Sequence, residues 1–131
     1  VNATYERGDG VSGITLLMGA AMHVHERVVE LLLQHGAKFD LQDSNGLTAL
    51  MIAAFKGHER VVDLLLRHCA EIDLQSNKGG TALMYAAVFD RPAVVRRLLR
   101  AGADSTARCA NGKTALQLAK EKGQAACVEA F

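Results

Sequence analysis

The chain carries an internal repeat of 33 residues, and no other feature constrains its fold as strongly. The stretch GLTALMIAAFKGHERVVDLLL at 46–66 returns in altered form as GGTALMYAAVFDRPAVVRRLL at 79–99. One threonine recurs at the same spacing, as Thr15, Thr48, Thr81 and Thr114. A glycine stands two residues before each of these threonines, and a leucine stands two residues after it. A fixed period of this length predicts similar small units stacked in a line.

Each unit reads as two short helices. In the second unit Leu50, Ala53 and Ala54 fall at i, i+3 and i+4, which places them on one helix face. Gly57 separates this helix from a second one, whose apolar residues within 61–66 are too many to face water. A helix pair this small cannot bury its own apolar faces, so each pair must complete its neighbour's core. The sequence therefore predicts an all-α helical repeat solenoid with β-turn or hairpin-like connectors.

Glycines mark the expected helix ends. Gly36 and Gly102 sit where second helices end, a position that favours the left-handed backbone region. Cys69 takes the equivalent position, so we expect a strained residue there, at a cost of about 1–2 kcal/mol. Asp90 replaces the glycine between the two helices of the third unit, and Pro92 follows it. An aspartate cap with proline just inside the helix predicts that Asp90 begins the second helix.

The repeated motif, GLTALMIAAFKGHERVVDLLLRHCA in the second unit, resembles the ankyrin repeat family over residues 13–131. The family's conserved residue types are met in this copy at Thr48, Leu50, Ala53, Ala54, Gly57 and His58. Two positions depart from the family's pattern: alanine or Leu16 replaces the proline, and Gln117 replaces the histidine in the fourth unit. In the other units that histidine is replaced by a methionine, as Met18, Met51 and Met84. The resemblance implies that methionine packing substitutes for the histidine's hydrogen bond near the turn.

The resemblance also divides the chain. It predicts one ankyrin repeat domain over 13–131, with units at about 10–42, 43–75, 76–108 and 109–131. Residues 1–12 fit no unit, and we expect them to form a flexible or irregular N-terminal segment. The fourth unit is cut short, so we expect the chain to be a segment of a larger protein. Lys120 replaces the second alanine of that unit, which is typical of a terminal repeat that stays soluble.

Composition narrows the classes of function. The formal net charge is +1, whereas nucleic-acid binding usually demands a clearly basic surface, so we expect no nucleic acid partner. No apolar run approaches the roughly 20 residues that span a bilayer, so we expect no membrane span. Three cysteines without CxxC spacing argue against a disulfide framework or a zinc site. We therefore expect an intracellular protein, cytoplasmic or nuclear.

The residues offer little for catalysis or metal binding. His25 and His58 occupy equivalent positions, so repetition alone explains the pair, and neighbouring units lie about 8–10 Å apart, too far for a shared zinc ion. His68 and Cys69 are sequence neighbours without the third group that orients a nucleophile. GDGVSG at 8–13 matches a dinucleotide-binding pattern by letter, but no apolar strand precedes it. We expect no enzyme, no cofactor and no metal.

The resemblance implies that turn tips and first helices form a concave face that binds proteins. Carried over by register, the outward positions include Asn45, Asn77 and Lys78. Apolar side chains at such positions predict a partner-binding strip, because exposed apolar patches and aromatic anchors mark interaction sites. The strip comprises Met22, Leu47, Ile52, Phe55, Tyr85, Val88 and Phe89. Two alternatives stay open: these side chains pack as extra core, or they pair copies of the chain in a structural, self-associating segment.

A basic run around the third unit offers a second surface. It comprises Arg91, Arg96, Arg97, Arg100 and Arg108. Arg96 and Arg100 stand at i and i+4 on one helix face. Such a surface could meet an acidic peptide or lipid headgroups. A solvated outer face is the simpler interpretation, balanced by Asp63, Glu71 and Asp104.

Overall fold

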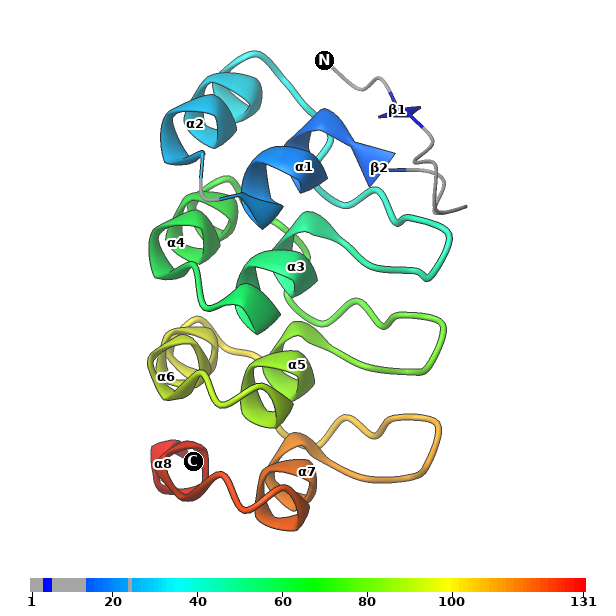
Figure 1. The fold of residues 1–131 in the computed structure, drawn as a ribbon, viewed down its shortest axis with the longest axis vertical. Helices are drawn as coiled ribbons and strands as arrows, with labels where there is room; N and C mark the ends of the chain where they lie inside the picture. The colour runs from blue at the N-terminus through cyan, green and yellow to red at the C-terminus, as the bar shows by residue number, and fades with distance from the viewer. Residues whose placement is uncertain (1–3, 6–13, 24) are drawn as a thin grey trace.

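The computed structural model describes residues 4–5, 14–23 and 25–131, and in this part of the chain it contains eight helices that stack as pairs (Figure 1). The first helices of the pairs form one column and the second helices form another. The helices are α1 (Leu16–Met22), α2 (Glu26–Gln34), α3 (Ala49–Lys56), α4 (Glu59–Arg67), α5 (Ala82–Val88), α6 (Pro92–Arg100), α7 (Ala115–Glu121) and α8 (Ala125–Ala130). The expected all-α repeat stack is confirmed.

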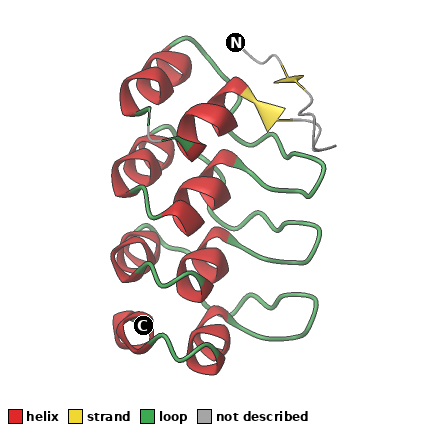
Figure 2. Cartoon of the chain, in the orientation of Figure 1, coloured by secondary structure: helices red, strands yellow, loops and turns green. Residues whose placement is uncertain are grey.

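Extended loops project from the helical columns, and we call each one a finger, named by the two helices that it joins (Figure 2). A pair of two-residue strands, β1 (Thr4–Tyr5) and β2 (Ile14–Thr15), lies antiparallel ahead of α1. The expected irregular segment over residues 1–12 lies outside the described residues, except for Thr4 and Tyr5. No helix in the described ranges has both the length and the apolar character that crossing a bilayer requires.

The repeated threonines begin the first helices. The side-chain oxygens of Thr48 and Thr81 accept hydrogen bonds from the backbone N–H groups of Met51 and Met84, at 3.2 and 3.3 Å. Thr114 does the same for Gln117, whose side chain accepts from the Thr114 N–H in return. Each such cap is worth about 1 kcal/mol of helix stability. The threonine spacing therefore sets where each first helix starts.

Left-handed residues end the helices, and here one expectation is confirmed and one is wrong. Cys69 has a φ of 65°, as expected for a residue that replaces the helix-ending glycine. Asp90 has a φ of 58° and occupies the same turn position as Gly57, at 75°, so it does not cap the following helix. Arg91 is the N-cap of α6, and Pro92 holds the first position of that helix. The chain must reverse between paired helices, and aspartate tolerates the left-handed conformation that this reversal needs.

The core runs continuously through the stack. Each first helix packs on the first helix of the next pair, and each second helix does likewise. Leu65 and Leu98, at equivalent positions of α4 and α6, are fully buried. Leu32, their equivalent in α2, packs against the same core but is half-buried, because among the described helices α2 has a second-helix neighbour only in α4. Met18 and Met51 are also buried, which confirms that methionine fills the position of the family's histidine.

Hydrogen bonds join successive fingers at fixed intervals. The side-chain amide of Gln42 donates to the carbonyl of Gln75 at 2.9 Å, and that of Gln75 donates to the carbonyl of Arg108 at 3.1 Å. The backbone N–H of Asn77 donates to the carbonyl of Asn45 at 3.0 Å. Because the same contacts recur from finger to finger, the fingers are held at a set spacing along the stack.

Candidate functional site

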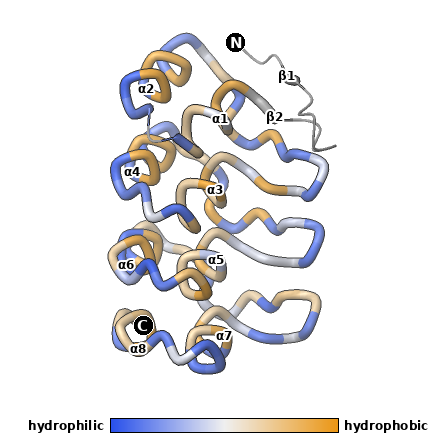
Figure 3. Tube along the Cα trace, in the orientation of Figure 1, coloured by the Kyte–Doolittle hydropathy of each residue, from blue (hydrophilic) through white to orange (hydrophobic). Residues whose placement is uncertain are grey.

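A groove lies where two neighbouring fingers meet the first helices. It has a volume of about 390 Å³, and we call it the finger groove. The α2–α3 and α4–α5 fingers form its polar rim. Its apolar floor is formed by Leu47 of the α2–α3 finger together with aromatic side chains of α3, of α5 and of the C-cap residue of α5. It is lined by Asn45, Leu47, Phe55, Ser76, Asn77, Lys78, Tyr85 and Phe89. Figure 3 shows that the tip of the α4–α5 finger is hydrophilic.

Three aromatic rings form a cluster at the floor of the finger groove. The ring centroid of Phe55 lies 5.4 Å from that of Phe89 and 6.4 Å from that of Tyr85, at tilted angles. Phe89 leaves 50% of its surface exposed, while Phe55 and Tyr85 are half-buried. Tilted aromatic pairs at such distances are favourable. The cluster therefore presents an apolar edge to solvent.

Tyr85 also has a structural task. Its hydroxyl and the Ser76 hydroxyl form a hydrogen bond of 2.7 Å, and Ser76 accepts a second one from the backbone N–H of Gly80. A Cβ added at Gly80 would come within 3.0 Å of the Tyr85 ring, so the ring lies directly on the finger. The tyrosine thus connects α5 to the α4–α5 finger. Part of its surface therefore packs within the fold, as one of the two alternatives for the strip expected.

The expected strip divides into three groups. Leu47, Phe55, Tyr85 and Phe89 line the finger groove, as already described. Met22 and Val88 are half-buried and lie outside its lining. Ile52 is 2% exposed, so the expectation that it faces outward is wrong. α3 packs between α1 and α5, and at this position isoleucine is covered, whereas the longer tyrosine at the equivalent position of α5 reaches the groove.

Ser76 is the lining residue that sequence reasoning missed. It corresponds by register to Asp43, whose carboxylate is occupied within its own turn, accepting from the N–H groups of Asn45 and Leu47 at 2.9 and 2.8 Å. Only the pairing of Ser76 with the Tyr85 hydroxyl distinguishes it, and that contact spans nine residues. No local pattern in the sequence indicates it.

Basic side chains contact the aromatic cluster and line the groove. Lys78 lines the finger groove, and the ammonium of Lys56 lies 5.6 Å from the centroid of the Phe55 ring. Arg91 donates from Nε to the carbonyl of Phe55 at 3.0 Å, at the C-terminal end of α3. A cation over an aromatic face is attracted by the ring's electron density. The groove therefore combines an apolar floor with a cationic border.

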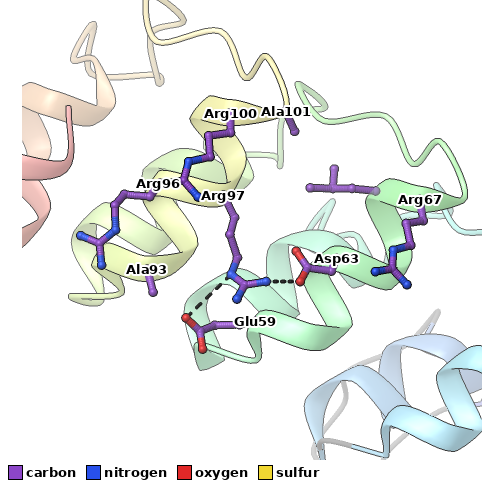
Figure 4. Close-up of a pocket in the computed structure, with 9 residues that line it drawn as sticks. Glu59, Asp63, Arg67, Ala93, Arg96, Arg97, Arg100 and Ala101 are labelled. Atoms are coloured by element: carbon purple, nitrogen blue, oxygen red, sulfur yellow. Dashed lines mark hydrogen bonds and ion pairs between the residues drawn. The ribbon is translucent and has the colours of Figure 1, made fainter.

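A second hollow, of about 700 Å³, lies between α4 and α6 on the outer side, and Figure 4 shows its side chains. Arg97 points toward Glu59 and Asp63, with Nε 3.8 Å from the Glu59 carboxylate and Nη1 paired with Asp63. The hydrogen bond that Arg97 donates to the Asp63 carboxylate raises the pKa of Arg97. Arg67 and Arg100 lie at the C-terminal ends of α4 and α6, where positive charge stabilises the helix dipole.

The balancing charges of the basic run are confirmed only in part. Asp63 pairs with Arg97 as expected. The Asp104 carboxylate instead accepts from the backbone N–H and the hydroxyl of Thr106, and these hydrogen bonds lower the pKa of Asp104. The backbone N–H of Glu71 donates to Asp40. These contacts, with the helix-end positions of Arg67 and Arg100, explain much of this surface without a ligand.

One of the five histidines contacts the backbone of a neighbouring unit. The ring nitrogen Nε2 of His58 lies 3.3 Å from the carbonyl oxygen of Met22, which joins two units. Cys69, Cys109 and Cys127 carry free thiols. Across the described ranges, no three His, Cys, Asp or Glu side chains gather as metal ligands would.

Comparison with protein families gives a match over most of the chain. A family model described as ankyrin repeats (3 copies) matches residues 17–109 and residues 64–131. No curated protein matches the chain.

Proposed function

Because the chain belongs to the ankyrin repeat family, we propose that it captures a protein or peptide partner in the finger groove. Ankyrin repeats generally serve as protein–protein interaction modules, and the family is typically non-enzymatic. We propose no cofactor and no nucleic acid partner for the chain. Its mechanism is capture by a preformed surface rather than chemical conversion.

The single observation that carries the proposal is the half-exposed ring of Phe89. It rests on the ring of Phe55, 5.4 Å away, within a groove whose rim carries Asn45, Asn77 and Lys78. An aromatic anchor on an apolar floor inside a polar rim is the anatomy of a binding hot spot. The finger-to-finger hydrogen bonds hold the rim in place, so a partner would spend little conformational entropy ordering it.

Self-association is the second candidate, and the first helix pair favours it. Leu16 and Val28 each leave 46% of their surface exposed, at the opposite end of the stack from α8. Apolar side chains that gather on one surface commonly mark an interface. In this alternative, two copies of the chain would meet through α1 and α2, and the finger groove would need no ligand.

Two matched variants separate the candidates. Phe89→Ala removes the groove's exposed anchor, and Val28→Ala removes a comparably exposed side chain far from the groove. Proteins captured from an extract of the source organism are purified and titrated against each variant by calorimetry. We expect Phe89→Ala to weaken a direct partner at least about tenfold, as hot-spot residues do, and Val28→Ala to leave its affinity unchanged.

Equal affinities of the wild type and Phe89→Ala for every captured protein would contradict the finger groove as the binding site. Sedimentation velocity over a hundredfold range of concentration tests the alternative. A mass that rises with concentration, and that Val28→Asp returns to the monomer, would favour self-association instead.

A further inference from the structure

The charges around the finger groove narrow the class of partner. We propose that its occupant is an acidic, extended segment of another protein, which seats one apolar side chain on the aromatic cluster between flanking carboxylates. This inference rests on the proposed function, since it describes the ligand of the same groove. The size of the groove and the charged side chains around it support the inference.

The size of the groove suits a short segment. Its volume of about 390 Å³ lies near the lower end of the roughly 300–1,000 Å³ of ligand pockets. Its apolar floor is confined to four side chains: Leu47, Phe55, Tyr85 and Phe89. A floor of this extent covers one inserted side chain, and the polar fingers on either side face the backbone that continues from it.

Lys78 gives the strongest indication that the ligand is negatively charged. It lines the groove on the α4–α5 finger, away from any helix end, and its ammonium has no ion-pair partner among the described residues. A helix dipole therefore does not explain its position. Lys56 adds a second exposed cation beside Phe55. Lys56 lies in the last turn of α3 and over the Phe55 ring, whereas Lys78 has neither of these contacts. Lys78 on the groove lining, with Lys56 beside it, complements a ligand that carries carboxylates beside its apolar side chain.

The remaining charged groups near the groove are occupied within the fold. Arg91 is committed to the carbonyl of Phe55. The Asp43 carboxylate accepts two backbone N–H groups of its own turn, and Asp90 accepts from the thiol of Cys127 at 3.7 Å. Among the described residues that line the groove, Lys78 carries the one charge and no carboxylate is present, so a basic segment would meet a like charge there. The groove discriminates by this repulsion as well as by attraction.

A displayed library of random 12-residue peptides tests the inference on the full chain. We expect selection to enrich peptides in which an apolar residue is flanked within two positions by Asp or Glu. For the best selected peptide, Lys56→Glu with Lys78→Glu should weaken binding about fivefold or more, because each change removes an attraction worth up to about fivefold and puts a repulsion in its place. Raising NaCl from about 50 to 500 mM should weaken the wild type in the same direction.

The matched control is Lys120→Glu with Arg100→Glu, which changes the net charge equally at exposed positions outside the groove. It should bind like the wild type, and thermal melting should show all three proteins equally folded. Peptides that depend on Phe89 but show no acidic enrichment, or that ignore the lysine reversal, would overturn this inference while leaving the proposed function. Selected peptides that do not depend on Phe89 would overturn both. Stronger binding of single-stranded oligothymidylate than of any peptide would also overturn it.

Discussion

Replacing Cys69 by glycine should stabilise the protein. Cys69 ends α4 with a φ of 65°, while Gly36 and Gly102 end the equivalent helices with φ values of 83° and 93°. A side chain in this region of φ destabilises the folded state by about 1–2 kcal/mol. Glycine avoids this strain, but it raises the conformational entropy of the unfolded chain, which offsets about 0.5–1 kcal/mol of the gain. Because the cysteine side chain is exposed, little packing is lost. The free energy of unfolding should therefore rise by about 0.5–1 kcal/mol.

Urea and thermal denaturation followed by circular dichroism would measure the change. For a chain of this length the gain corresponds to a rise in Tm of about 2–4 °C. Ala101→Gly is the control, because Ala101 caps the equivalent helix α6 with a φ of −82° and gains nothing from glycine. It should lose about 0.5–1 kcal/mol. A Cys69→Gly variant no more stable than the wild type would refute the strain argument.

Three further outcomes follow from the packing, and chemical denaturation measures each of them. Leu65→Ala should lose about 2–5 kcal/mol and the exposed Leu31→Ala less than about 1 kcal/mol, and equal losses would contradict the stacked core. Gly79→Ala should lose more unfolding free energy than Gly112→Ala, although both glycines have positive φ. Of the two, only Gly79 would place the new Cβ in a clash, 2.8 Å from a backbone nitrogen of the next finger. Equal losses would disprove that contact. Burial raises the pKa of the Cys127 thiol above its model-compound value of 9.0. The unfolded chain then ionises first, so the free energy of unfolding should fall as pH rises above about 9, less steeply in Cys127→Ala, and an unchanged slope would contradict the burial.

The helical stack could be predicted from the sequence because its determinants are local and recur every 33 residues. Thr48 caps a helix through an N–H only three residues away, and Gly57 ends that helix through its own φ. Leu65 is buried because the next unit presents the same apolar face. Each of these causes acts within one unit or between similar neighbours, so the repeated motif contains the information.

The details of the groove depend on contacts that the repeat does not encode. Ile52 and Tyr85 share one position in the motif, yet one is covered and the other reaches the groove, because side-chain length decides how far each extends past its neighbours. Asp90 looks like a helix cap beside a proline, but the reversal between α5 and α6 demands a left-handed residue there. Ser76 belongs to the groove because its hydroxyl bonds the Tyr85 hydroxyl, and the other units have no equivalent tyrosine.

The most direct test of the finger groove is an NMR titration of the isotopically labelled chain with a purified partner or a selected peptide. We predict that the largest backbone shifts occur at Leu47, Phe55 and Phe89 and along the two fingers beside them. Residues of the outer hollow, such as Arg67 and Arg100, should not shift. Shifts concentrated on the outer hollow, with the aromatic cluster unperturbed, would contradict the assignment of the groove as the binding site.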